Sequence, residues 1–204
     1  MILTRLQYGH SRACGLAWYT CAFGRHRPRF KSGQAHFNLC VFYDVPLPVY
    51  VFRLLFVCHA NVCRSPLCEF VMKKIVSDRG MSDGFLIESA GTDPDEGCDI
   101  WFRSKEVMDA NGIPWESRSA RQLVPEEYGD WDMFVVMDYS NLEDAKAILG
   151  GDPEGKVRLL LRDRAVGDPY FHGDFNRSFA EIERGCISLL GDILQITRDR
   201  TGSD

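Results

Sequence analysis

The stretch LLFVCHANVCRSPLCEF, from Leu54 to Phe70, passes from an apolar run through a short polar loop into a pattern with helical spacing. The apolar run predicts a buried strand over Phe52 to Val57, and the residues after the loop predict a helix from Pro66 to Arg79. Two cysteines, an asparagine, an arginine and a serine lie around the junction. A strand that passes directly into a helix is typical of a parallel α/β sheet.

The same alternation of strand and helix patterns continues along the chain. The remaining predicted strands are Phe85 to Ser89, Asp132 to Met137 and Val157 to Leu161. The remaining predicted helices are Arg103 to Ala110, a segment that ends at Leu149, and a last helix whose apolar residues recur from Phe175 to Ile193. This alternation predicts an α/β fold with a parallel sheet covered on both faces. In such sheets ligands bind beyond the carboxyl ends of the strands, where the loop after Val57 lies.

Two of the predicted helices carry capping signals. Ser65 is the predicted N-cap of the first helix, with Pro66 suited to the first helical position and Gly80 suited to the end. Ser140 and Glu143 form a predicted capping box ahead of the helix that ends at Leu149.

Length and composition limit the classes that the protein can belong to. The 204 residues are enough for one α/β domain and a modest extra segment. Residues 1–50 hold six basic side chains and one acidic side chain, whereas residues 51–204 hold 18 basic and 28 acidic side chains. Because nucleic-acid phosphates attract a basic surface, this acidic part predicts no nucleic-acid partner. No apolar run approaches the ~20 residues of a membrane-spanning helix, which predicts no membrane span.

The first 50 residues are expected to stay outside the folded domain. The stretch DVPLPVY, Asp44 to Tyr50, contains two prolines and is typical of a linker. We therefore expect residues 1–50 to form a poorly ordered N-terminal extension and residues 51–200 to form the domain. An arginine-rich, acid-poor targeting segment is the alternative for this extension. Eight cysteines in a chain that opens without a secretory signal predict a reducing, cytoplasmic setting.

The loop between the first strand and the first helix has the residues of an anion site. Cys58 and Arg64 have the spacing C-x5-R, which can bring a thiol and a guanidinium to one small anion. The spacing does not decide the matter, because Cys21 and Arg27 share it without a preceding apolar strand. At Cys58 the chain leaves a strand and enters a helix, so the amides from His59 to Arg64 can point inward at the positive helix end.

The side chains of this loop suit phosphate chemistry. Arg64 can hold two oxygens of a tetrahedral anion through its planar guanidinium. Cys58 lies where the helix field and Arg64 favour the thiolate, the nucleophilic form. Ser65 can donate its hydroxyl to that sulfur, while Ala60 and Asn61 fit the tight turn because asparagine tolerates left-handed torsions. The alternative is a buried structural cysteine beside a capping serine and a surface arginine.

Asp168, in the GDPY stretch, is the candidate acid. It follows the last predicted strand on a loop that reaches the same edge of the sheet as Cys58. An alkoxide or phenoxide leaves more easily when a positioned acid protonates it. Tyr170 and Phe171 can line the pocket and stack on an aromatic leaving group. An ordinary Asp-Pro turn is the alternative.

With these residues identified, the chain resembles the low-molecular-weight protein tyrosine phosphatases. The residues that carry the resemblance are FVCHANVCRSP (56–66), ESAGT (88–92), ARQL (120–123), VMDYSNL (136–142) and GDPY (167–170), in family order over nearly all of residues 53 to 197. The resemblance implies a three-layer flavodoxin-like fold, with a four-stranded parallel sheet and helices on both faces. It implies hydrolysis of protein phosphotyrosine, and of small aryl phosphates, through a cysteinyl-phosphate intermediate without cofactor or metal.

Mapped onto this chain, the resemblance implies Cys58 as nucleophile, Arg64 as phosphate holder, and Asp168 as general acid and later base. The implied substrate contacts are His59, Ala60, Asn61, Val62, Cys63, Ser65 and Tyr170. Among these, Asn61 would hold the shape of the loop and Cys63 could close a reversible disulfide with the nucleophile. We expect a monomer whose partner is a phosphotyrosine protein or a small phosphate ester.

Three departures from the family pattern concern substrate preference. His59 and Ala60 stand where the family usually has Leu or Thr and then Gly. Pro94 to Glu96 stand where a pocket aromatic is often found. Arg118 stands where a histidine often precedes the ARQL match.

Other functions remain open at this point. An arsenate reductase on the same scaffold would use further cysteines, of which only Cys98 lies in the middle of the domain. A protein arginine phosphatase typically has threonine where this chain has Val62. A non-catalytic phosphate-binding or phosphocarrier domain would not need Asp168.

A zinc site and an aromatic recognition surface are weaker alternatives. The candidate zinc ligands are Cys58, His59, Cys63 and Cys68, whose spacing does not match paired C-x2-C ligands. We expect Trp101, Phe102 and Trp131 to be core or rim aromatics, and His172 to be a solvated loop residue.

Overall fold

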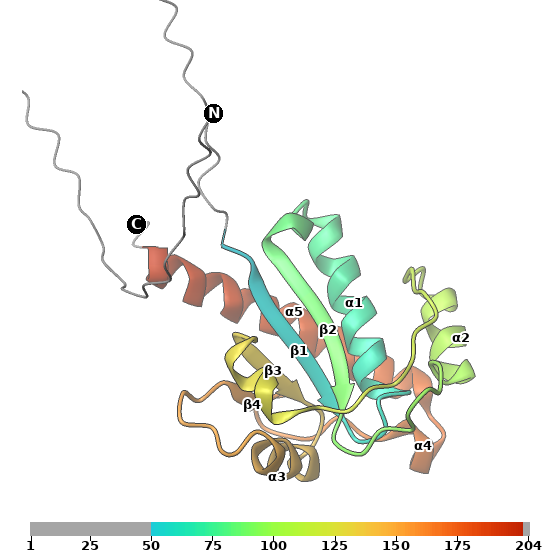
Figure 1. The fold of residues 1–204 in the computed structure, drawn as a ribbon. Helices are drawn as coiled ribbons and strands as arrows, with labels where there is room; N and C mark the ends of the chain where they lie inside the picture. Colours follow the sequence, from blue (N-terminus) through green and yellow to red (C-terminus); the bar gives the residue numbers. More distant parts are fainter. Residues whose placement is uncertain (1–49, 202–204) are drawn as a thin grey trace, which may run out of the picture. The chain divides into compact units, whose positions relative to one another are not determined.

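The computed structural model describes residues 50–201, so the predicted N-terminal extension lies, apart from Tyr50, outside the described residues. Four parallel strands form one sheet in the order β2-β1-β3-β4 (Figure 1). The strands are β1 Phe52–Cys58, β2 Phe85–Gly91, β3 Met133–Val136 and β4 Val157–Leu159. The α-helices are α1 Arg64–Asp78, α2 Phe102–Ala110, α3 Tyr139–Ile148, α4 Pro169–His172 and α5 Phe175–Thr201. Two 3₁₀ turns, η1 Ser82–Gly84 and η2 Pro125–Gly129, complete the order.

Helices cover the two faces of the sheet unequally. Alternate residues of β1, such as Leu54 and Phe56, belong to the core cluster that also contains residues of α1, α2 and α5. The residues between them, such as Leu55 and Val57, pack in a second cluster with residues of α3. Figure 1 shows α1 and α5 on one side of the strands and α3 on the other. The predicted three-layer α/β fold, with a four-stranded parallel sheet, is confirmed.

The register of the strands places several loops at one edge of the sheet. Cys58 at the end of β1 lies opposite Gly91 at the end of β2, and Val57 lies opposite Val136 at the end of β3. Since all strands run in the same direction, the loops that follow them meet at this carboxyl edge. The fold therefore brings distant parts of the chain to the loop that follows Cys58.

The first helix begins earlier than the sequence predicts. Helix α1 starts at Arg64, with Cys63 at the N-cap position and without a side-chain capping bond. The prediction that Ser65 caps this helix is wrong, because Ser65 lies in the first turn and is fully buried. Its hydroxyl contacts the side chains of Cys58 and Asn61 instead. Gly80 has φ +66° just after the helix, as its predicted place at the end requires.

The predicted capping box of the third helix is also wrong. Helix α3 begins at Tyr139, and Asp138 is the N-cap, because its Oδ1 accepts a hydrogen bond of 2.7 Å from the backbone N–H of Asn141. Ser140 therefore lies inside the first turn, where its hydroxyl contacts Asp144. An aspartate at the strand end competes well for the N-cap position.

Other differences are small. Strand β2 continues to Gly91, two residues beyond the prediction, and the loop after β4 contains the short helix α4.

Within residues 50–201, no helix is both long enough and apolar enough to cross a membrane.

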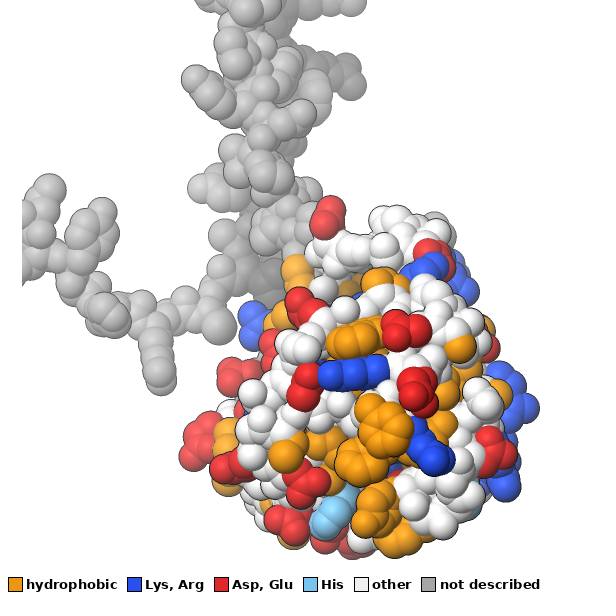
Figure 2. All heavy atoms as spheres, turned by 90° about the vertical axis from the view of Figure 1, so that its right-hand side faces the viewer, with side chains coloured by type: hydrophobic (Ala, Val, Ile, Leu, Met, Phe, Trp, Pro, Cys, Tyr) orange, Lys and Arg blue, Asp and Glu red, His pale blue; other side chains and the backbone are white. Residues whose placement is uncertain are grey.

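Exposed aromatic side chains gather on the face that carries α2 and α4. They are Trp101, Phe102, Tyr170 and Phe171. Figure 2, which looks onto this face, shows hydrophobic side chains lying among acidic and basic ones.

Candidate active site

The loop of residues 58–64, called here the anion loop, is shaped by one left-handed residue and its side-chain bonds. Asn61 has φ 56° and is 2% exposed. Its amide nitrogen donates to Oγ of Ser65 at 2.9 Å and to Oγ of Ser89 at 3.0 Å. Its amide oxygen accepts a bond of 3.0 Å from the backbone N–H of Arg121. Because every polar atom of this amide is satisfied inside the protein, the left-handed turn is held in place.

The backbone of the anion loop leaves its donors available. Among residues 50–201, the amide N–H groups of residues 59–63 donate to no backbone or side-chain acceptor. The carbonyls of residues 58–60 accept bonds from the loop that follows β2, which fixes the path of the chain. Helix α1 begins directly afterwards and adds the partial positive charge of its N-terminus. Such a run of amides can hold a tetrahedral anion.

Cys58 lies at the base of the anion loop. Its Sγ is 3.0 Å from Oγ of Ser65, and only 3% of the residue is exposed. Since Ser65 Oγ accepts a hydrogen from Asn61, its own hydroxyl hydrogen can point to the sulfur. The other acceptor of that hydroxyl, the carbonyl of Ala90, lies farther away at 3.3 Å. The geometry thus offers a hydrogen bond to a thiolate at Cys58.

Arg64 is held by carboxylates on two other loops. Its Nη1 lies 2.6 Å from Oδ2 of Asp138, and its Nη2 lies 2.6 Å from Oδ2 of Asp168. Burial disfavours the charge of Arg64, but the sulfur of Cys58 and the two carboxylates outweigh burial and raise the pKa of the guanidinium. The guanidinium is therefore charged and fixed in orientation next to the sulfur.

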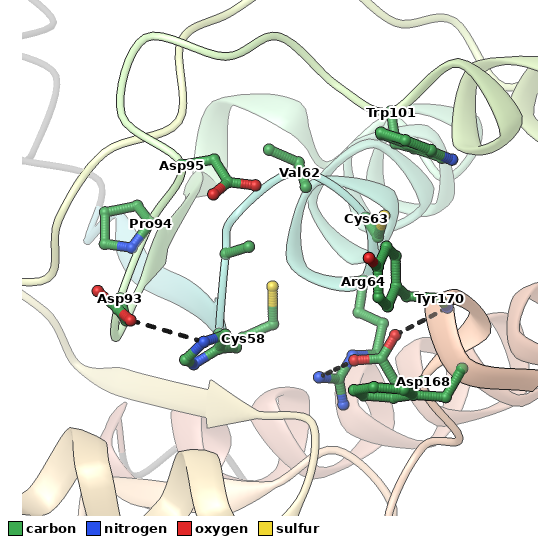
Figure 3. Close-up of a pocket in the computed structure, with 13 residues that line it drawn as sticks. Cys58, Val62, Cys63, Arg64, Asp93, Pro94, Asp95, Trp101, Asp168 and Tyr170 are labelled. Atoms are coloured by element: carbon green, nitrogen blue, oxygen red, sulfur yellow. Dashed lines mark hydrogen bonds and ion pairs between the residues drawn. The ribbon is translucent and has the colours of Figure 1, made fainter.

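Asp168 faces the anion loop from the segment before α4. Its Oδ1 accepts a bond of 3.0 Å from the backbone N–H of Tyr170, so Asp168 is also the N-cap of α4. Its Oδ2 contacts Arg64, and Figure 3 shows the carboxylate directed toward the pocket that contains Cys58. Asp168 therefore lies at the same sheet edge as the predicted nucleophile, where the sequence placed it.

These groups line one pocket of about 320 Å³ (Figure 3). Its lining residues are Cys58, His59, Ala60, Val62, Cys63, Arg64, Asp93, Pro94, Asp95, Trp101, Asp168, Tyr170 and Phe171. Every predicted site residue except Asn61 and Ser65 lines this pocket. The side chains of those two residues lie buried behind the anion loop, so they support the loop rather than line the pocket.

The sequence did not single out Asp93 or Asp138, and it named Pro94 and Asp95 only as departures from the family pattern and Trp101 only as a core or rim aromatic. Asp93, Pro94, Asp95 and Trp101 also line the pocket. Asp138 holds Arg64 from the end of β3. One signal could have found Asp138, since it is an acidic residue directly after a predicted strand, at the edge where the site was expected.

Arg118, one of the three departures from the family pattern, supports the loop from behind. Its Nη2 donates to Oδ1 of Asn61 at 2.9 Å and to the carbonyl of Ser89 at 3.0 Å, and its Nη1 lies 3.3 Å from Oε2 of Glu69. A guanidinium can only donate, so it requires the oxygen of the Asn61 amide to face it. The amide nitrogen then faces Ser65 and Ser89. Arg118 does not line the pocket and contacts the site through Asn61, and an effect of this departure on substrate preference stays a prediction.

Cys63 is a protonated thiol at neutral pH. Burial raises its pKa, and the sulfur of Cys58 raises it further, to about 12.

Within residues 50–201, no group of three or more His, Cys, Asp or Glu side chains could hold a metal ion. The described residues therefore give no support to the zinc alternative built on Cys58, His59, Cys63 and Cys68.

The close approach of Gly91 to the anion loop gives a testable prediction. A Cβ at Gly91 would lie 2.5 Å from the carbonyl oxygen of His59 and 3.1 Å from Cβ of Asn61. We expect Gly91→Ala to displace the loop, lower the free energy of unfolding by about 1–3 kcal/mol and lower kcat/KM by up to about 100-fold. Urea unfolding and initial rates on p-nitrophenyl phosphate measure both effects.

The matched control is Gly84→Ala, because a Cβ at Gly84 meets nothing within 4 Å. This variant should stay close to wild type in both measurements. Equal behaviour of the two variants would contradict the tight contact between β2 and the anion loop.

Comparison with known proteins agrees with this geometry. The family model described as "Low molecular weight phosphotyrosine protein phosphatase" matches residues 53–201. The human protein of that name is 33% identical over 150 residues, which cover 67% of this chain and 92% of the human one. The Bacillus subtilis low molecular weight protein-tyrosine-phosphatase YfkJ is 29% identical over 153 residues, covering 69% of this chain and 94% of its own.

Solved structures show the same arrangement of elements. The crystal structure of YfkJ from Bacillus subtilis has a TM-score of 0.68 at 27% identity, covering 71% of this chain and 96% of its own. That of SP-PTP, a low molecular weight protein tyrosine phosphatase from Streptococcus pyogenes, has a TM-score of 0.65 at 29% identity, covering 70% and 93%. With the family model spanning most of the chain, these likenesses show that this protein belongs to the low molecular weight phosphotyrosine protein phosphatase family.

Proposed function

We propose that residues 51–200 hydrolyse phosphotyrosine in proteins, and small aryl phosphates, through a cysteinyl-phosphate intermediate. One observation carries the proposal. The sulfur of Cys58 lies at the base of an amide-lined loop, and the carboxylate of Asp168 faces it across one pocket, with Arg64 beside both. A phosphate-binding module would need the loop and Arg64 but not a carboxylate aimed at the same space. The proposed setting is a monomer in the cytoplasm.

In the first step, the thiolate of Cys58 attacks phosphorus as the bond to the tyrosine oxygen breaks. The amides of the anion loop and the guanidinium of Arg64 hold the three remaining phosphoryl oxygens. The carboxyl group of Asp168 gives its proton to the departing phenolate. A phosphate bound to Arg64 would displace the Asp168 carboxylate from it, which leaves this side chain available as an acid.

In the second step, water attacks phosphorus and the S–P bond breaks. Asp168, now a carboxylate, accepts a proton from that water, and the electron pair of the broken bond returns to sulfur. Inorganic phosphate leaves and the thiolate is restored. Across the two steps, Asp168 gives up one proton and regains one. Arg64 and the amides of the anion loop stabilise the charge on the phosphoryl oxygens.

A turnover panel tests the proposed substrate class. Phosphotyrosine, phosphoarginine and arsenate are compared with the full chain, by phosphate release for the first two and by thiol-dependent arsenite formation for the third. Turnover of phosphotyrosine well above that of the other two supports the proposal. A preference for phosphoarginine would favour a protein arginine phosphatase, and a preference for arsenate would favour an arsenate reductase. No turnover of any substrate would favour a non-catalytic phosphate-binding domain.

Reversible oxidation gives a further prediction. Peroxide would oxidise Cys58 to a sulfenic acid with release of hydroxide, and the thiol of Cys63 would then displace water to form a disulfide. The charge on the Cys58 sulfur is one cause of the raised pKa of Cys63, so its loss makes Cys63 a better nucleophile. We expect dithiothreitol to restore most activity after peroxide in wild type, but little in Cys63→Ser.

Activity of both proteins is followed before peroxide, after it and after dithiothreitol. Cys98→Ser serves as the control, because Cys98 is exposed and does not line the pocket. Irreversible loss in wild type, or equal recovery in Cys63→Ser, would contradict the protective pair.

A further inference from the structure

We propose that the mouth of this pocket selects phosphotyrosine segments that carry a lysine or arginine next to the phosphotyrosine. The inference rests on the proposed function and names a substrate class for it. Its basis is the loop after β2, where Asp93 and Asp95 line the same pocket as Cys58. These carboxylates lie at the mouth, across the pocket from Tyr170 (Figure 3).

Asp95 is the unpaired charge of this mouth. Its backbone N–H donates to the carbonyl of Ala60 at 3.2 Å, which fixes the backbone against the anion loop. Within residues 50–201, its side chain makes no hydrogen bond or ion pair. Figure 3 shows the carboxylate turned toward the cavity, on the side where Val62 lies. An exposed carboxylate held in this position can pair with a cation on a bound peptide.

The other charges near the mouth do not neutralise Asp95. Asp93 pairs with the imidazole of His59 at 3.7 Å, with both side chains largely exposed. Among residues 50–201, Arg64 is the only Lys or Arg that lines the pocket, and it is already bonded to the carboxylates of Asp138 and Asp168. The lining is therefore net acidic, although the group to be bound is a phosphate dianion. A substrate that brings its own cation offsets this repulsion.

The aromatic ring and the flanking cation would occupy different parts of the pocket. Tyr170 and Phe171 are mostly exposed and pack edge to face, with ring centroids 5.4 Å apart. Together with Trp101 they form an apolar wall that suits the phenyl ring of phosphotyrosine. The acidic wall on the loop after β2 is left for the residue next to it. The aromatic wall would contact the phenyl ring of phosphotyrosine, and the acidic wall would contact the basic residue next to it.

The test compares phosphotyrosine peptides that differ only in the flanking residues. Arginine, alanine or glutamate is placed on either side of phosphotyrosine, and kcat/KM is measured with the full chain at low and high salt. An exposed ion pair predicts that each flanking arginine raises kcat/KM about two- to fivefold over alanine, and that glutamate lowers it by a similar factor. Salt should shrink both effects because it screens exposed charges.

Two variants with the same change in charge locate the effect. In Asp95→Asn we expect kcat/KM to fall for the arginine peptides and to rise for the glutamate peptides. The ratio of kcat/KM on arginine peptides to kcat/KM on glutamate peptides should therefore become smaller than in wild type. Glu96→Gln removes one negative charge from the next residue, which is exposed and does not line the pocket. In this variant the ratio of kcat/KM on arginine peptides to kcat/KM on glutamate peptides should stay at the wild-type value.

Equal rates on arginine and glutamate peptides in wild type would overturn the inference, as would equal narrowing by Asp95→Asn and Glu96→Gln. Neither result would touch the proposed function, which fails only if phosphotyrosine itself is not turned over. The two failures are therefore distinguishable in one set of assays.

Discussion

Replacing Cys58 by serine should abolish the turnover of aryl phosphates, with kcat lower by on the order of 10⁴-fold or more. A serine hydroxyl in the same place is a weak nucleophile, because the described residues around it hold no base within hydrogen-bond distance of the sulfur. Its side-chain hydrogen-bond partner within residues 50–201 is Ser65, whose Oγ lies 3.0 Å from Sγ and is not a general base. Initial rates on p-nitrophenyl phosphate measure the loss.

Binding should survive this substitution. The amides of residues 59–63 and the guanidinium of Arg64 are unchanged in Cys58→Ser, so inorganic phosphate should still raise the melting temperature of the variant. Cys98→Ser is the matched control, because Cys98 is exposed and does not line the pocket. It should keep the wild-type rate. A Cys58→Ser protein with near wild-type activity would rule out the proposed nucleophile.

Replacing Asp168 by asparagine should produce the second largest loss, and the loss should depend on the leaving group. Asparagine can still accept the bond from the backbone N–H of Tyr170, so the cap of α4 remains while the acid is removed. General acid catalysis typically contributes 10²- to 10⁴-fold, so we expect kcat/KM on phosphotyrosine, which reports the step in which the tyrosine leaves, to fall by about 10²-fold or more. The loss on p-nitrophenyl phosphate should be smaller, because nitrophenolate leaves without help from an acid.

Asp174→Asn controls for the removal of a carboxylate from the same segment. Asp174 Oδ1 accepts a bond of 2.9 Å from the backbone N–H of Arg177, a role that asparagine can also fill. Its rates should match wild type on both substrates. If Asp168→Asn lowered kcat/KM on both substrates by the same factor, Asp168 would act through the structure of the site instead of through proton transfer to the leaving group.

Local features of the sequence were enough to predict the fold and the position of the loop at the centre of the site. The apolar run before Cys58 forms β1, and Asn61 takes the left-handed torsion that its position requires. The order of strands and helices then leaves few ways to build a parallel sheet, so the loops after β1 and β4 had to meet at one edge. That argument placed Asp168 near Cys58 without any long-range information.

What could not be predicted depends on contacts between distant segments. Ser65 has the residue type of an N-cap, but its burial behind the anion loop gives its hydroxyl to Cys58. Arg118 follows a segment without regular structure, and only the fold brings its guanidinium to Asn61 and to the buried Glu69. Asp95 lines the pocket because the loop after β2 bonds to the carbonyl of Ala60. No periodic pattern in the sequence records these pairings.

Mass spectrometry of the acid-quenched enzyme during turnover tests the central claim most directly. With p-nitrophenyl phosphate, a peptide that contains Cys58 should carry one phosphoryl group in wild type and none in Cys58→Ala. Because water attack also uses Asp168, the phosphorylated fraction should be at least as large in Asp168→Asn. Phosphoryl label on another residue, or turnover without label at Cys58 when the peptide is fully recovered, would contradict the covalent mechanism.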